Sequence, residues 1–183
     1  MVELESILRY NKLLTIHYRG GVRMAEQKTN VMRVLEQKKI AYTPHEYPHG
    51  AEAVDGVTVA QLTGQDPATV FKTLVTVGAS KAHYVFVIPV AKELHLKKAA
   101  AAVGEKSIAM IHVSEITPLT GYVRGGCSPL GMKKQFRTVF DASAEVIDTI
   151  QVSGGRIGTQ ISLAPADLIA LVRGETADIT TEE

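Results

Sequence analysis

The first residue that could take part in chemistry is a lysine inside an apolar segment. Lys72 stands in Val70-Phe-Lys-Thr-Leu-Val75, whose branched and aromatic residues predict a strand. A strand repeats every two residues, so Lys72 shares a face with Leu74 and points either to water or into a cleft. The pattern by itself favours a lysine that reaches solvent along its aliphatic stem. The alternative is an ammonium held in a pocket, where it would bind a phosphate or polarise a carbonyl.

The second feature is the glycine-rich run Gly121-Tyr-Val-Arg-Gly-Gly-Cys-Ser-Pro-Leu-Gly131. Its glycines permit positive φ angles and a close approach of the backbone to a ligand. Its amides could hold an anion or an oxyanion, although an ordinary structural loop is the alternative. The run does not match the phosphate-binding loop, which needs Gly-x4-Gly-Lys-Ser/Thr. A second glycine segment, Ser153-Gly-Gly-Arg-Ile-Gly158, predicts a tight turn between two strands.

Neither Ser128 nor Cys127 fits the pattern of a nucleophile. Ser128 lacks the Gly-x-Ser-x-Gly elbow, because Leu130 occupies the position of the second glycine. Pro129 has no amide hydrogen to donate to an oxyanion. Cys127 would need a histidine partner that the sequence does not identify, so we interpret it as a small buried thiol.

Metal binding is not expected either. His45 and His49 are four residues apart, but Pro44 and Pro48 exclude the helix that would bring them to one face. Basic residues give either a local phosphate-binding surface or scattered solubilising charge. They are Lys92, Lys97, Lys98, Arg124, Lys133, Lys134, Arg137 and Arg156.

Composition predicts one soluble, cytoplasmic domain. The 183 residues are 45% hydrophobic, which is enough for one core, and 20 basic against 19 acidic residues give a formal charge of +1. This charge excludes a strong global attraction to nucleic acid. The single cysteine excludes an intrachain disulfide and fits a reducing compartment. No apolar stretch is long enough to span a membrane. We expect residues 1–23 to be a dispensable extension and residues 24–183 to form the domain.

The elements that must position these residues alternate without a regular βαβ rhythm, which favours an α+β fold with a mixed or antiparallel sheet. A hairpin is predicted at Val70–Val77 and Tyr84–Pro89. Ile40–Tyr47 is predicted to be extended, because Pro44 and Pro48 break any helix. Further strands are predicted at Ser107–Ile111, Arg137–Phe140, Ile150–Ser153, Thr159–Leu163 and Ala177–Thr180. Helices are predicted within Gln27–Lys39, Thr58–Thr63, Leu94–Val103 and Ala166–Val172, and Ser114 is expected to cap a short turn before Pro118.

Three segments together resemble the YbaK proteins, which are related to the editing domain inserted in bacterial prolyl-tRNA synthetases. They are Val70–Val75, Gly121–Gln135 and Val152–Gly158, and they occur in the expected order between Met24 and the C-terminus. The resemblance implies a single mixed-sheet, barrel-like domain with surrounding helices. It also turns Lys72 from a solvent-facing lysine into a site residue.

The resemblance implies hydrolysis of the ester of misacylated aminoacyl-tRNA, with Cys-tRNA(Pro) as the closest substrate type. This chemistry uses no cofactor, metal or enzyme nucleophile, and in the cysteine-specific branch the substrate's own thiol attacks its ester. The implied partners are the 3′ end of tRNA and prolyl-tRNA synthetase. The alternatives are a deacylase for another small amino acid such as alanine, a thiol enzyme using Cys127, and a module that binds aminoacyl-tRNA or a synthetase without catalysis.

Lys72 is the implied catalytic residue, holding the phosphate or ester of the terminal adenosine. Amides of Gly125–Ser128 are expected to face the oxyanion. One departure concerns Gln160, which stands where relatives often carry an aspartate, with Asp141 as a possible substitute. The implied substrate-binding residues are Tyr47, Phe71, Thr73, Gly125, Gly126, Cys127, Ser128, Pro129, Ser153, Gly154, Gly155 and Gln160.

Overall fold

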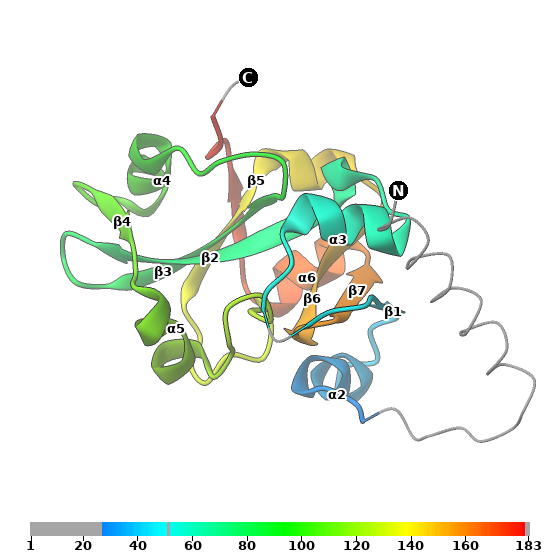
Figure 1. The fold of residues 1–183 in the computed structure, drawn as a ribbon. Helices are drawn as coiled ribbons and strands as arrows, with labels where there is room; N and C mark the ends of the chain where they lie inside the picture. Colours follow the sequence, from blue (N-terminus) through cyan, green and yellow to red (C-terminus); the bar gives the residue numbers. More distant parts are fainter. Residues whose placement is uncertain (1–26, 51, 182–183) are drawn as a thin grey trace, which may run out of the picture.

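The computed structural model describes residues 27–50 and 52–181, which form two β-sheets with helices around them (Figure 1). The expected extension at residues 1–23 lies outside the described residues. The strands are β1 (Thr43–Glu46), β2 (Phe71–Gly78), β3 (His83–Pro89), β4 (Ile108–Met110), β5 (Arg137–Asp141), β6 (Ile150–Arg156), β7 (Thr159–Leu163) and β8 (Glu175–Ala177). The α-helices are α2 (Asn30–Gln37), α3 (Gly56–Thr63), α4 (Leu96–Val103), α5 (Val113–Thr120) and α6 (Pro165–Leu171).

The smaller sheet is antiparallel, in the order β1-β7-β6. Its β6–β7 hairpin turns through the second glycine segment, and a bulge lies between Ser153 and Arg156. Ile150, Ile161 and neighbouring apolar residues point into the main core. The opposite face carries polar side chains, which gives the sheet the alternation expected of strands with one face in the core.

The larger sheet is mixed, in the order β4-β2-β3-β5-β8. The predicted β2–β3 hairpin is confirmed, with Phe71 opposite Pro89 and Val77 opposite His83. β5 and β8 then add in parallel. Both faces of the sheet are covered: one contributes Phe71 and Val75 to the main core, and the other packs on α4 (Figure 1).

The prediction of one barrel-like sheet is wrong, although the mixed α+β class is confirmed. Among the described residues the two sheets meet at one bridge, between Val70 and Gln151, and no closed barrel forms. The reason lies in β2. One edge of β2 pairs with β3 along its length, while the other is taken by β4 at Thr76–Gly78 and meets β6 only at Val70.

Local capping explains where the helices begin and end. The side chain of Thr29 accepts a hydrogen bond from the amide of Met32 at the start of α2, and Asp55 does the same for Thr58 at the start of α3. Helices α3 and α4 end at Gly64 and Gly104, both left-handed, as their sequences predict.

Two predictions about the periphery are wrong. Ser114 does not cap a short turn, because α5 begins one residue earlier, after His112, whose amide donates to Glu115. The last strand, β8, begins two residues earlier than the predicted Ala177–Thr180 and shares only Ala177 with it, because parallel pairing with β5 fixes its position.

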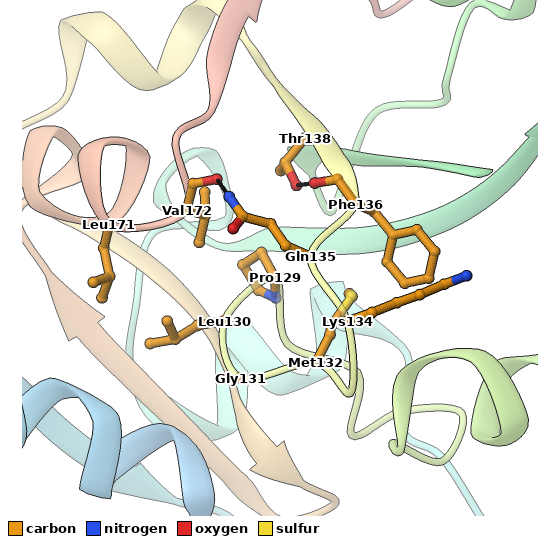
Figure 2. A pocket seen from close by; sticks show the side chains of 10 residues that line it. All are labelled: Pro129, Leu130, Gly131, Met132, Lys134, Gln135, Phe136, Thr138, Leu171 and Val172. Atoms are coloured by element: carbon orange, nitrogen blue, oxygen red, sulfur yellow. Dashed lines mark hydrogen bonds between the residues drawn. The ribbon is translucent and has the colours of Figure 1, made fainter. Parts of the chain in front are cut away.

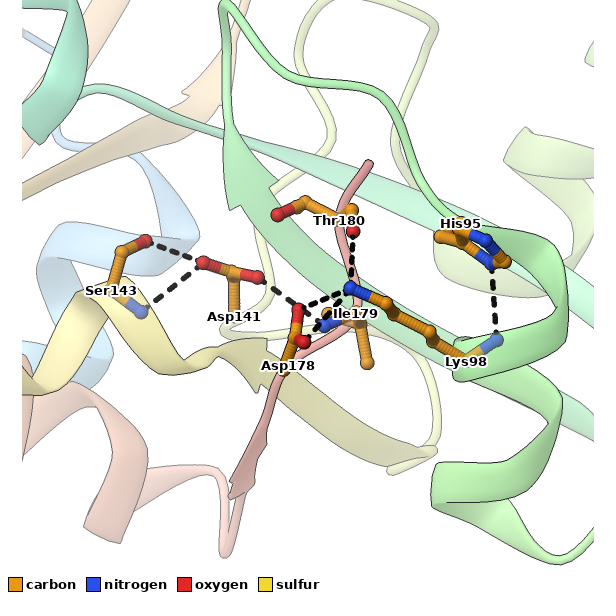
Figure 3. A network of polar contacts seen from close by, with 7 residues as sticks. All are labelled: His95, Lys98, Asp141, Ser143, Asp178, Ile179 and Thr180. Carbon is orange, nitrogen blue, oxygen red and sulfur yellow. Dashed lines mark hydrogen bonds and ion pairs between the residues drawn. The ribbon is translucent and has the colours of Figure 1, made fainter. Parts of the chain in front are cut away.

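After β8 the chain is held by buried and polar contacts (Figure 3). Ile179 is fully buried, and its amide donates to the Asp141 carboxylate. Lys98 donates to both Asp178 and the backbone carbonyl of Thr180. These contacts close the core between the larger sheet and α4.

Among the described residues, no helix has both the length and the apolar character that crossing a membrane requires.

We predict that Ile179→Ala lowers the free energy of unfolding by about 2–5 kcal/mol, because it leaves a cavity under the C-terminal segment. Urea denaturation measures this loss. The matched control is Val146→Ala, at a valine that is 85% exposed, which should change stability by less than about 0.5 kcal/mol. Equal effects of the two changes would contradict the role of Ile179.

Candidate functional site

A cavity of about 140 Å³ opens where the two sheets fail to join. This is roughly the liquid volume of four to five water molecules, which suits a small chemical group. Its wall comes from the start of β2, the glycine run, the N-terminal part of α3 and the polar face of the smaller sheet. The lining residues are Tyr47, Val54, Gly56, Val59, Val70, Phe71, Lys72, Thr73, Val90, Gly125, Cys127, Ser153 and Gln160.

Lys72 lies at this cavity with its side chain 28% exposed. Its ammonium is 3.1 Å from a carboxylate oxygen of Glu93, whose side chain is 80% exposed. An ion pair with so exposed a partner contributes little, typically 0–1 kcal/mol. Lys72 can therefore exchange Glu93 for an anionic or carbonyl group of a ligand at small cost.

Two polar atoms of the cavity wall have no partner. Gln160 on β7 is 7% exposed, and its carbonyl oxygen is buried without a hydrogen bond. The hydroxyl of Thr73, next to Lys72 on β2, is in the same condition. Buried polar atoms are normally paired, so both atoms have an unused capacity for a hydrogen bond.

The two glycine segments that the sequence singled out pack against each other. A side chain on Gly126 would bring its Cβ within 3.0–3.1 Å of the backbone of Arg156 and Ile157, so any other residue would push the two segments apart by a few tenths of an ångström. Gly125 has a φ of +83°, and a Cβ there would lie 2.5 Å from that of Ala53. The run is therefore fixed against the β6–β7 turn at the rim of the cavity.

Backbone amides of the run differ in availability. The amide of Gly126 donates to the carbonyl of Val123 at 3.0 Å and is thus occupied. In the part of the chain that the structure describes, no hydrogen bond is seen for the amides of Gly125 and Cys127. Both residues line the cavity, so these two N–H groups have no backbone partner that would compete with a bound group.

Cys127 forms part of the wall as a neutral thiol. Burial raises the pKa of its thiol to about 11, against which a hydrogen bond with Thr120 acts weakly. At neutral pH the thiolate is therefore scarce, and Cys127 lacks the lowered pKa of a catalytic cysteine.

Eight of the thirteen predicted site residues meet at the cavity and five do not. Ser128 is fully buried, and its hydroxyl accepts a hydrogen bond from the amide of Leu130. Pro129 lines a separate cavity of about 200 Å³ together with Phe136 and Leu171 (Figure 2). The remaining three, Gly126, Gly154 and Gly155, shape the turns behind the wall.

The sequence did not reveal the apolar half of the cavity. Val54, Gly56 and Val59 come from the start of α3, and Val70 and Val90 flank the β2–β3 hairpin. These are ordinary core residue types. The one local signal was Asp55, the helix cap that fixes this end of α3 beside the cavity.

Asp141 does not replace the missing aspartate. Its carboxylate accepts from the amide and hydroxyl of Ser143 and from the amide of Ile179, away from the cavity (Figure 3). Three of the eight basic residues form ion pairs in the described part of the chain: Lys98 with Asp178, Arg137 with Glu175 and Arg156 with Glu46. Lys133 donates to the carbonyl of Thr117, and Lys134 lies over the ring of Phe136.

Comparison with known proteins shows that the chain is similar to tRNA-editing proteins. The family model described as the aminoacyl-tRNA editing domain matches residues 51–171. A protein of Enterococcus faecalis named as a Cys-tRNA(Pro)/Cys-tRNA(Cys) deacylase, EbsC, is 45% identical over 158 residues, covering 86% of this chain and 96% of the relative.

Solved structures share the fold. One, described as a trans-editing enzyme for prolyl-tRNA synthetase, has a TM-score of 0.74 at 24% identity, covering 87% of this chain and 99% of that one. A scaffold protein used for computational epitope grafting has a TM-score of 0.75 at 23% identity, covering 87% of this chain and 100% of its own.

We predict that Cys127 reacts slowly with iodoacetamide at pH 8, because its raised pKa leaves little thiolate. Its alkylation, followed by mass spectrometry, should accelerate as the pH approaches 11. The same chain unfolded in urea is the control and should react at the rate of free cysteine. A native thiol that reacts as fast as the unfolded one at pH 8 would contradict this environment.

Proposed function

We propose, because the chain belongs to the aminoacyl-tRNA editing domain family, that it hydrolyses the ester of misacylated tRNA in trans, with Cys-tRNA(Pro) as its substrate. The observation that carries the proposal is the cavity that unites Lys72 with two unpartnered polar atoms and two available amides. Each of these groups matches a part of an aminoacyl ester.

Lys72 supplies the positive charge for the ester or for the phosphate of the terminal adenosine. As an ammonium on a flexible stem, it follows the charge that develops on the carbonyl oxygen. The amides of Gly125 and Cys127 add donors to the same oxyanion. These contacts strengthen as the carbonyl becomes tetrahedral, so they lower the barrier without a covalent step on the enzyme.

The nucleophile of this proposal is the substrate's own thiol. Its sulfur bonds to the ester carbonyl carbon, the bond to the tRNA oxygen breaks, and the thiol proton passes to the released hydroxyl of the tRNA. The thioester that results is then open to water. The thiol and the ester belong to the same aminoacyl group, so the attack is intramolecular, and the cavity would accelerate it by holding that group in the reactive orientation.

The size of the cavity favours a small aminoacyl group. Synthetase pockets discriminate poorly between side chains that differ by a few atoms, and a second site of about 140 Å³ acts as a separate sieve. Alanine is the second candidate on this ground, because it would also fit.

The tRNA beyond its 3′ end would meet the basic residues around the glycine run, such as the exposed Arg124 next to Gly125. With a formal charge of +1, affinity from charge alone is small, so association with prolyl-tRNA synthetase would supply tRNA selectivity. The protein would then act in the cytoplasm, where tRNA is charged and used.

The test is a deacylation assay on a panel of misacylated tRNAs, run with the wild-type protein and with Lys72→Ala. We expect release of cysteine from Cys-tRNA(Pro), and a loss of about 10²–10³ in rate for Lys72→Ala, as for removal of one transition-state donor. Lys106→Ala, at a lysine outside the cavity, is the matched control, and circular dichroism checks that each variant is folded.

Activity of Lys72→Ala equal to that of the wild type would remove Lys72 from the mechanism. Binding of tRNA with a steep salt dependence, but without turnover on any member of the panel, would identify a binding module in place of a deacylase.

A separate prediction concerns Cys127. We expect Cys127→Ala to keep most of the deacylase activity, within about tenfold of the wild type, because the buried thiol is part of the wall and does not attack the ester. Steady-state kinetics with Cys-tRNA(Pro) measure it. Complete inactivation of a folded Cys127→Ala protein would favour a thiol-dependent enzyme.

A further inference from the structure

Two residues that line the cavity each have a buried polar oxygen without a hydrogen-bond partner. The carbonyl oxygen of Gln160 comes from β7, and the hydroxyl oxygen of Thr73 comes from β2. Both residues line the same cavity, and both atoms are hidden from bulk water. Leaving such an atom buried and unpaired costs about 1–3 kcal/mol, so the fold keeps them at some expense.

Neighbouring polar residues on the same sheet face show that this is a local exception. Gln151, opposite Ser162 in the sheet, donates to Thr63 through its amide nitrogen and accepts from Ser162 through its oxygen. Ser153, opposite Gln160, accepts a hydrogen bond from the amide of Gly155. The neighbouring polar side chains on this face therefore have hydrogen-bond partners, whereas the carbonyl oxygen of Gln160 at the cavity has none.

The unpaired atoms define the chemistry of the missing group. A carbonyl oxygen can only accept a hydrogen bond, and a hydroxyl can accept while it donates elsewhere. Their ligand must therefore carry at least one hydrogen-bond donor, and an amine with two or three N–H groups can donate to both atoms. None of the described residues that line the cavity is a carboxylate, so this donor has no ionic partner in the wall.

Resting on the deacylase function proposed above, we infer that Gln160 and Thr73 are specificity-determining residues that accept hydrogen bonds from the α-amino group of the aminoacyl ester. This group has two or three N–H donors, depending on its protonation. Lys72 and the amides of Gly125 and Cys127 are donors and face the ester oxygens. The cavity then has an accepting end for the amine and a donating end for the ester.

A neutral amide at position 160 suits this task better than a carboxylate would. A carboxylate next to Thr73 would compete with Glu93 for Lys72, since opposite charges in a partly buried site attract strongly. Gln160 accepts from the amine and leaves the Lys72 charge to the ester. The departure from the family pattern therefore separates amine recognition from ester activation.

The inference predicts that the enzyme requires a free α-amino group. The experiment compares tRNA(Pro) charged with cysteine and tRNA(Pro) charged with 3-mercaptopropionate, which keeps the thiol and the ester and lacks the amine. Each kcat/KM is divided by the spontaneous hydrolysis rate of the same ester. We expect the wild type to prefer the cysteinyl ester by about tenfold to hundredfold, the range of a hydrogen bond to a charged group.

Gln160→Leu and Thr73→Val each remove one acceptor and should each reduce this preference at least about fivefold, mainly by slowing cleavage of the cysteinyl ester. The matched control is Thr76→Val. Thr76 lies on the same strand but on the opposite face, and it donates to the carbonyl of Tyr84, so its variant should keep the wild-type preference. Thr73→Val preserves shape and serves as the test if Gln160→Leu fails to fold.

The outcomes separate the two proposals. A wild-type protein that cleaves neither ester nor any other misacylated tRNA would overturn the deacylase function. Cleavage of both esters with equal normalised rates, or variants at Gln160 and Thr73 that keep the wild-type preference, would overturn the role of the acceptor pair and leave the deacylase function standing.

Discussion

The pairing along the edges of strand β2 determines how the two sheets meet. β2 gives its first edge entirely to β3, and its second edge is divided between β4 at one end and a single bridge from Val70 to Gln151 at the other. Residues between these pairings have no strand partner on that side among the described residues. Completion of the pairing would make a barrel with a filled interior. The interruption instead opens the cavity, and it does so beside Lys72.

The two glycine segments act as one device because they support each other. Gly126 lies this close to the backbone of Arg156 because it has no side chain, and this contact places the amides of Gly125 and Cys127 at the rim. Neither turn would hold that position alone. The cavity thus combines a fixed backbone on one side with a lysine whose exposed ion pair is easily exchanged on the other. Such preorganisation suits an ester that is labile before it is bound.

Sequence patterns predicted most elements because their signals are local. The β2–β3 hairpin and the strand at Thr159–Leu163 follow from branched residues, and the ends at Gly64 and Gly104 follow from helix capping. The division into two sheets could not be predicted, since it depends on which distant strands pair with the second edge of β2. The predicted position of the last strand was wrong for a similar reason, because pairing with the distant strand β5 sets it.

The candidate site was predictable only in part. Lys72 alone indicated a solvent-facing residue, and family resemblance was needed to place it at a site. Resemblance also assigned Ser128 and Pro129 to the substrate, but neither residue lines this cavity. The valines of α3 carry no chemical signal at all. The unpaired carbonyl oxygen of Gln160 can be recognised only from the positions of its neighbours on the sheet.

The open stretch of β2 has one last consequence, for solubility. Unpaired strand edges invite other chains to add a strand, and lysine is a common guard against such aggregation. Here the stretch is short and carries Lys72, whose charge disfavours the addition of another strand at this edge.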